Sequence, residues 1–212
     1  MVDPGDLDGG EVRDALVRQW ERIADAVPEI DLDLPSRLEG WRNREVLAHL
    51  YVQPFMLSRF LKSASRQEPS TQLLENLSST QSYSELIDVS AREGAEKGKY
   101  NFGVALEATL PDLLEADLDM TITTLQGSIS LTDYLVTRCV EAMVHGSDLV
   151  APVVPDEVAE AITASALKRL LAIRSAHLLP EAEGLPVGEW IAVATGRQQV
   201  FGVLASAVPL MS

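Results

Sequence analysis

The chain has 212 residues, of which 46% are apolar and 23% are charged. This length and composition are typical of a globular protein with a substantial core, so they predict one domain, or one domain with a small appendage, and exclude a wholly disordered chain. The net charge of −15, from 32 acidic and 17 basic residues, disfavours nucleic-acid binding because the phosphate backbone is negative as well.

The cysteine count and the hydropathy pattern predict a cytoplasmic protein. Cys139 is the only cysteine, so no intramolecular disulfide can form. The first residues are acidic and polar, and they lack the basic region and apolar core of a signal peptide. No apolar run reaches the roughly 18 residues that a membrane span needs, so we expect no membrane association.

The first third of the chain predicts two helices. Residues 1–10, rich in Gly and Asp, predict a loose tail. Apolar residues then recur at helical spacing over 11–26, and residues 29–40 are expected to form an ordered connection. A second helix is predicted over 43–65. Pro54 lies inside it, and because proline removes a backbone hydrogen bond we expect a kink there.

The middle of the chain predicts a broken helix followed by an extended segment. Residues 66–82, rich in Ser, Gln and Thr, predict a mobile connection with a helical turn around 73–77. A third helical region over 84–115 contains several glycines, which favour a break. The Ile and Thr residues of 119–130 predict a short extended segment or hairpin. A fourth helix then runs to about Val150.

The remaining residues complete a mainly α protein. A fifth helix is predicted over 156–178, followed by a linker over 180–188 and a short apolar segment. The fold class is therefore a four-helix bundle with a short extended segment before the fourth helix and a small C-terminal appendage. We assign residues 1–179 to the helical bundle and residues 180–212 to a linker and a short C-terminal segment that packs on the bundle.

A narrow polar stripe runs along the otherwise apolar fourth helix. Glu141 and His145 are four residues apart, which places them one above the other on one helix face. Arg138 and Asp148 fall on the same face. Cys139 lies about 160° around the helix from Glu141, so we expect it to be a buried free cysteine. The stripe faces either solvent or a site.

The stripe suggests a metal site, although spacing alone leaves a second interpretation open. Glu141 and His145 could supply two ligands, and His49 on the second helix could supply a third. Two imidazoles and one carboxylate with an open position are typical of catalytic zinc, and they would also suit nickel or iron. The alternative is that Glu141 and His145 form a solvated pair, while His49 is a core histidine bonded to a backbone carbonyl.

Three segments of the chain resemble motifs of a known family. The sequence GWRNREVLAHL at residues 40–50 is similar to the "GW…DLVAHL" segment of the DinB-like superfamily, in its mycothiol-dependent maleylpyruvate isomerase branch. The sequence RCVEAMVHGSDL at residues 138–149 is similar to that branch's second motif, "R…E…HxxDL". Residues 189–197 resemble the "W…TGR" piece of its C-terminal region.

The resemblance implies a DinB-like four-helix bundle that holds a metal ion near one end. By motif position, His49, Glu141 and His145 would be the metal ligands. The metal would be divalent, with zinc as the first choice and nickel or iron as alternatives. Characterised relatives use a low-molecular-weight thiol, mycothiol in actinobacteria, for isomerisation or S-transfer, so mycothiol is the expected cosubstrate.

Three charged residues are candidates for supporting such a centre. Arg138 either binds an anionic group or braces Glu141 one turn away, and helix geometry favours the brace. Asp148 either accepts a hydrogen bond from the second ring N–H of His145, or it caps the next turn or lies in solvent. Glu45 either assists the metal or stabilises the first turn of its own helix.

The sequence therefore predicts a metal-dependent enzyme of the DinB-like class. We expect a thiol-dependent transferase or isomerase that acts on a small electrophilic substrate. A non-catalytic metal- or ligand-binding helical module and a metal-dependent hydrolase are the alternatives. The expected partners are the small thiol and the electrophile, without nucleic acid or membrane, and a homodimer is left open.

Overall fold

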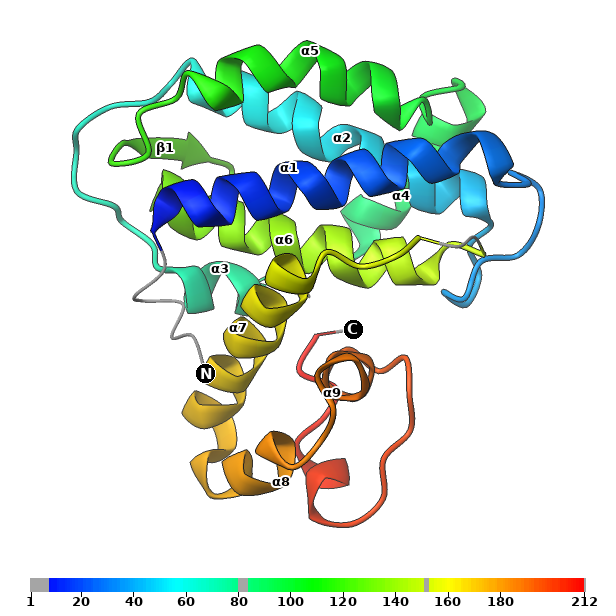
Figure 1. Cartoon of the computed structure of the whole chain (residues 1–212), viewed down its shortest axis with the longest axis vertical. Coiled ribbons are helices and arrows are strands. Elements are labelled where there is room, and N and C mark those ends of the chain that lie inside the picture. Colours follow the sequence, from blue (N-terminus) through cyan, green and yellow to red (C-terminus); the bar gives the residue numbers. More distant parts are fainter. Residues whose placement is uncertain (1–7, 80–83, 151–152, 212) are drawn as a thin grey trace.

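A bundle of four helices forms the upper part of the molecule (Figure 1). The computed structural model describes residues 8–79, 84–150 and 153–211. The bundle helices are α1 (Gly9–Ala26), α2 (Asn43–Leu61), α5 (Phe102–Leu114) and α6 (Leu131–Asp148). Each packs against two others, α1 on α5 and α6, and α2 on α5 and α6. This arrangement confirms the predicted mainly α, four-helix fold.

The core of the bundle explains why these segments become helices. Residues at positions i, i+3, i+4 and i+7 are buried along α1, and Trp20 is fully buried, with its indole edge-on to the ring of Phe102 at 6.3 Å. α6 has buried residues on most of its circumference, because helices contact it from several sides. The charged stripe predicted on α6 is therefore not on an open surface.

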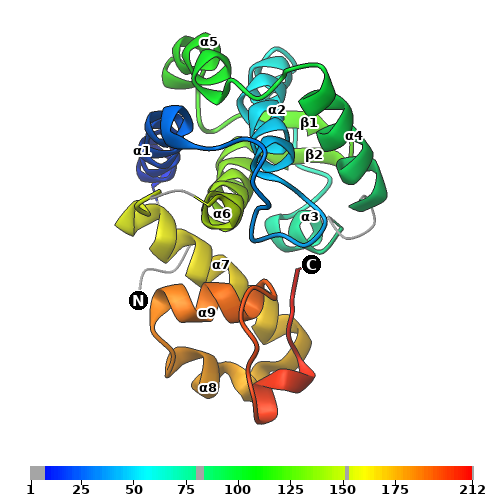
Figure 2. The ribbon, with the colours of Figure 1, turned by 90° about the vertical axis from the view of Figure 1, so that its right-hand side faces the viewer.

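The third helical region breaks as its glycines predict. It forms α4 (Ser84–Glu96) and α5, separated by a turn in which Gly98 has a φ of 69°, a conformation that glycine adopts without steric cost. α4 leaves the bundle and packs on the flank of α2 (Figure 2). That position places α4 beside the polar stripe of α6 rather than inside the bundle.

The extended segment before the fourth helix is confirmed as a hairpin of β1 (Thr121–Thr124) and β2 (Gly127–Ser130). Its two inward residues, Ile122 and Ile129, face each other across the strands and are fully buried. The Ser130 hydroxyl then accepts a hydrogen bond from the Asp133 N–H at 3.0 Å and caps α6. The hairpin thus sets the starting point of the helix that carries the stripe.

The described part of the 66–82 connection is more ordered than the sequence suggests. The backbone N–H groups of Ser70 and Thr71 donate to the Ser128 carbonyl of β2 at 2.9 Å. The helical turn expected at 73–77 is confirmed as α3 (Leu73–Ser79), which contacts α6. Residues 80–83 of this predicted connection lie outside the described residues.

The C-terminal part forms a second layer below the bundle (Figures 1 and 2). α7 (Glu157–Ser175) is capped by Asp156, whose carboxylate accepts hydrogen bonds from the N–H groups of Val158 and Ala159. The linker predicted over 180–188 is helical at both ends, because α8 (Leu179–Glu183) forms its first part and α9 (Val187–Ala194) begins before it ends. α7 contacts α1 and α6 on one side and α9 on the other, so it joins the two layers.

No helix within the described ranges has the length and apolar character that a membrane crossing requires.

Candidate metal centre

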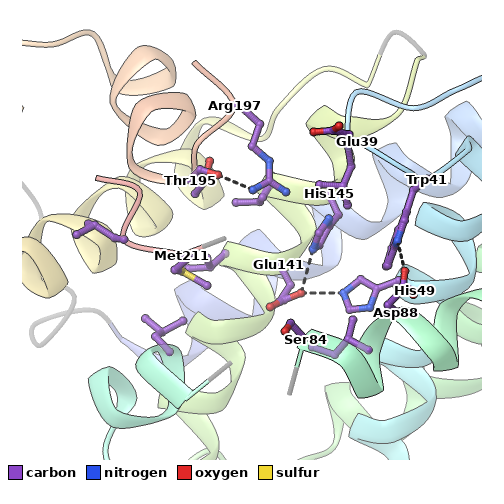
Figure 3. Close-up of a pocket in the computed structure, with 16 residues that line it drawn as sticks. Glu39, Trp41, His49, Ser84, Asp88, Glu141, His145, Thr195, Arg197 and Met211 are labelled. Carbon is purple, nitrogen blue, oxygen red and sulfur yellow. Dashed lines mark hydrogen bonds and ion pairs between the residues drawn. The ribbon is translucent and has the colours of Figure 1, made fainter. Parts of the chain in front are cut away.

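Helices α2 and α6 bring the three predicted ligand residues together (Figure 3). His49 on α2 donates from Nε2 to Oε2 of Glu141 on α6 at 2.9 Å. The Nε2 atom of His145, one turn further along α6, lies 3.5 Å from the same oxygen. One nitrogen from each imidazole and one oxygen from Glu141 all lie within 4.8 Å of one another. The stripe therefore faces α2, and not solvent.

His145 is oriented by a buried ion pair. Its Nδ1–H donates to Oδ2 of Asp148 at 2.9 Å, one of the two arrangements expected for that carboxylate. Arg197 holds the same carboxylate with two donors, Nε to Oδ1 at 3.0 Å and Nη2 to Oδ2 at 2.8 Å. Because Nδ1 makes the hydrogen bond to Asp148, Nε2 is the ring nitrogen that faces the centre.

Glu141 has a further neighbour on α2. The side-chain amide of Gln53 donates to Glu141 Oε2 at 3.4 Å and accepts from Arg138 through Oε1. The Arg138 Nε also donates to the Thr137 hydroxyl at 3.1 Å. The predicted direct contact between Arg138 and Glu141 is therefore wrong. Arg138 binds Gln53 instead, and Gln53 in turn contacts Glu141.

An aromatic ring forms another wall of the centre. The Trp41 ring lies parallel to the His145 ring, with centroids 6.5 Å apart, and edge-on to His49 at 5.9 Å. Its indole Nε1 donates to Asp88 of α4 at 2.7 Å (Figure 3). This hydrogen bond joins α4 to the segment just before the N-terminus of α2, and it holds the indole against both imidazoles.

Burial and local charge set the protonation of the centre. Burial lowers the pKa of His49 by more than its hydrogen bond with Glu141 raises it, so the neutral imidazole is favoured. Burial alone would raise the pKa of Glu141, but the His49 hydrogen bond and the nearby charges outweigh it and leave the pKa below its usual range. Neutral imidazole and ionised carboxylate are the forms that bind a metal ion.

Glu45, Cys139 and the third histidine of the chain, His177, lie away from the ligand atoms or are used elsewhere. Glu45 accepts from the Arg42 N–H at 2.8 Å and from the Arg44 guanidinium at 3.1 Å, so it serves the N-terminus of α2. Cys139 is fully buried among apolar groups, which raises the pKa of its thiol. His177 is exposed in the turn after α7.

Two cavities meet at His49 and Glu141. The first, of about 220 Å³, is bounded by Trp41, His145 and Arg197, and also by Leu210 and Met211 of the C-terminal segment. We call it the first chamber (Figure 3). The second chamber, of about 390 Å³, lies between α2, α4, α6 and the hairpin. The paired ligand residues thus have open space on two sides.

Sequence reasoning did not assign Gln53 and Arg197 to the site. Gln53 had a usable signal, because it is four residues after His49 and so falls on the same face of α2. Arg197 ends the segment that resembles the family's "W…TGR" piece, but its partner had no local signal, since Arg197 is 49 residues from the Asp148 that it binds and reaches it through the packing of α9 on α7.

The donor set fits a tetrahedral metal ion. Zinc bonds of about 2.0–2.1 Å place neighbouring ligand atoms about 3.3 Å apart, close to the 2.9 Å and 3.5 Å that separate Glu141 Oε2 from the two Nε2 atoms. The second nitrogen of His145 is already held by a carboxylate, as is usual for histidine ligands. The three ligand atoms lie within 4.8 Å of one another, so they would move closer together when the three-ligand arrangement forms.

Comparison with known proteins places the chain in a family. Residues 13–150, more than half of the chain, match the family model of the mycothiol maleylpyruvate isomerase N-terminal domain. The fold is similar to the crystal structure of the mycothiol-dependent maleylpyruvate isomerase, with a TM-score of 0.56 and 18% identity over 79% of this chain and 72% of that chain. No curated protein matches the chain. The chain therefore belongs to the mycothiol maleylpyruvate isomerase N-terminal domain family.

Proposed function

We propose that this protein is a metal-dependent enzyme in which a small thiol, mycothiol, reacts with an electrophilic substrate by isomerisation or S-transfer. The convergence of His49, Glu141 and His145 within 4.8 Å at the meeting point of two chambers carries the proposal. Family membership supports the choice of mycothiol. Zinc is the metal that this donor set suits best.

The protein side chains would bind and orient the reactants. A divalent cation bound to these ligands supplies positive charge that favours the thiolate over the thiol. Asp148 keeps the His145 ring and tautomer in place, and Trp41 screens the two imidazoles from water. The two chambers give a thiol and an electrophile separate approaches to one centre, which would lower the entropic cost of bringing them together.

We expect the purified protein to bind about one equivalent of zinc. His49→Ala and His145→Ala should each reduce bound zinc to a small fraction, because two remaining ligands hold the ion poorly. His177→Ala is the matched control, since this third histidine is exposed and away from the centre. Metal analysis after dialysis against zinc measures all four proteins. Equal zinc in the two site variants and the control would rule out these ligands.

Thiol use has a separate test in the cobalt(II)-substituted protein. We expect mycothiol to bind with one-to-one stoichiometry and to produce a thiolate-to-cobalt absorption band, because an open coordination position accepts the sulfur. The analogue in which a hydroxyl replaces the thiol is the control and should produce no such band. A fully loaded protein that binds no mycothiol would contradict thiol use and favour a hydrolase or a binding module.

A further inference from the structure

The second chamber is lined mostly by residues that are not candidate metal ligands. It shares His49, Glu141 and Ile87 with the first chamber. Along α6, the second chamber borders Tyr134 and Arg138, whereas the first chamber borders Val140, Val144 and His145. The two chambers are therefore consecutive along the groove between α2 and α6, with the candidate metal ligands at their common wall.

Arg138 is a cation in the second chamber that forms no direct ion pair with any described residue, although the carboxylate of Glu141 lines the same chamber on the far side of the Gln53 amide. Two of its donors are used, by the Thr137 hydroxyl and the Gln53 amide, and its guanidinium lies 4.8 Å from the centroid of the Tyr134 ring. Within the described ranges, no acidic group forms a salt bridge with it. A guanidinium has five N–H donors, so Arg138 retains donors for an anion.

The arginine of the first chamber is different. Arg197 is already neutralised by the buried carboxylate of Asp148, which it binds with two donors. Glu39 and Asp88 add negative charge around the same chamber. Glu141 borders both chambers, so the difference between them is that Arg138 has no direct ion pair among the described residues, whereas Arg197 is held by Asp148. An anionic group would therefore find an available guanidinium in the second chamber and not in the first.

The second chamber also fixes where such an anion would lie. The Gln53 amide contacts Arg138 with its oxygen and Glu141 with its nitrogen. Only this amide therefore separates the guanidinium from the candidate metal ligand Glu141. The rest of the chamber is mostly apolar. Its apolar wall includes Val52, Met56, Phe60, Leu86, Ile87 and Leu125.

We propose that the second chamber binds an electrophile with one anionic group, such as a carboxylate, which pairs with Arg138 close to the reacting carbon while an apolar remainder contacts Met56, Phe60 and Leu86. This assignment rests on the proposed function for the identity of the reaction. It makes Arg138 the residue that determines substrate charge. It also assigns the uncharged, hydroxyl-rich thiol to the first chamber.

A purely structural role for Arg138 makes a different prediction. If Arg138 only holds Gln53, its loss would weaken the binding of charged and uncharged ligands alike. A role in anion binding would instead change the preference between a carboxylate and its neutral amide. That preference is therefore the decisive measurement.

The experiment compares hexanoate with hexanamide as unreactive probes, by calorimetric titration of the zinc-loaded and the chelator-treated protein. We expect the wild type to prefer hexanoate by roughly 10- to 100-fold, the range of a charge-assisted hydrogen bond. Arg138→Met should lose this preference. Arg66→Met is the matched control and should retain it, because Arg66 is exposed and pairs with Asp117. Adipate should bind more weakly than hexanoate, since its second carboxylate would face the apolar wall.

The outcomes separate this proposal from the metal-dependent function. A hexanoate preference that survives Arg138→Met, or that is absent in the wild type, overturns the anion site. A preference that depends on Arg138 in a protein that binds no zinc supports the anion site while the metal-dependent function fails.

A second variant covers the case in which Arg138→Met does not fold. Leu125 is 79% exposed at the hairpin turn and lines the chamber, so Leu125→Asp should fold and repel hexanoate. Leu125→Asn is its neutral control. Equal hexanoate affinity in these two variants counts against the proposal.

Discussion

Asp148→Ala is expected to lower the free energy of unfolding by about 3–5 kcal/mol, the usual cost of removing one partner of a buried ion pair. The Asp148 side chain is fully buried and accepts hydrogen bonds from both His145 and Arg197. Its loss would leave the Arg197 guanidinium, 17% exposed, without a counter-charge. Urea unfolding of both proteins measures the change.

The same substitution should also weaken zinc binding by about 10- to 100-fold, the usual effect of losing the group that orients a histidine ligand. Without the carboxylate, the His145 ring can rotate and change tautomer. A competition titration with a chromophoric chelator measures the affinity. Unchanged zinc affinity would show that His145 does not depend on Asp148.

Two further variants separate the buried pair from general effects of charge. Asp117→Ala removes an exposed aspartate that pairs with Arg66, so it should cost about 1 kcal/mol or less. The double variant Asp148→Ala with Arg197→Met should be more stable than Asp148→Ala alone, because it removes the uncompensated charge. A double variant that is less stable than Asp148→Ala would contradict this account of the pair.

Trp190→Ala is expected to lower the free energy of unfolding by about 3–5 kcal/mol, as for other fully buried aromatic residues. The Trp190 side chain is fully buried, and its indole Nε1 donates to the Ala164 carbonyl of α7 at 3.0 Å. This contact holds α9 on α7. Since Arg197 follows α9 directly, we also expect weaker orientation of His145 and reduced zinc affinity.

Two substitutions test the cause of this effect. Trp190→Phe keeps most of the packing and loses the hydrogen bond, so it should cost less than Trp190→Ala. Phe201→Ala should change stability by less than about 0.5 kcal/mol, because Phe201 is 88% exposed. Urea unfolding with hydrogen exchange in α9 measures stability and its location. A Trp190→Ala protein as stable as Phe201→Ala would mean that α9 is not held by this residue.

The outline of the fold was predictable because its signals are local. Helices α1, α2, α6 and α7 follow apolar periodicity at 3.6 residues per turn, which depends only on near neighbours in the chain. The hairpin was visible in the alternation of Ile and Thr. α8 and α9 were missed since they are short, and short helices depend on packing more than on their own sequence.

The candidate site was predictable in its three ligand residues, which the family resemblance assigned to one centre, but not in the hydrogen bonds around them. The spacing of Glu141 and His145 placed both on one face of α6. Spacing alone did not decide whether that face is turned to solvent or to the interior. The direction of that face is set by the packing of α2 on α6. Arg138 was assigned the wrong partner because helix spacing favours Glu141, whereas the structure interposes Gln53 from α2.

The sequence by itself determined the helices, the hairpin and the presence of two imidazoles and a carboxylate of the kind that binds metal ions. The tertiary structure alone decided that His49 donates a hydrogen bond to Glu141, that Arg197 neutralises Asp148, and that Arg138 lines a second chamber. The reason is physical. Periodicity is a property of residues within one or two turns, while these contacts join residues from 49 to 92 positions apart and arise only when buried surfaces pack together.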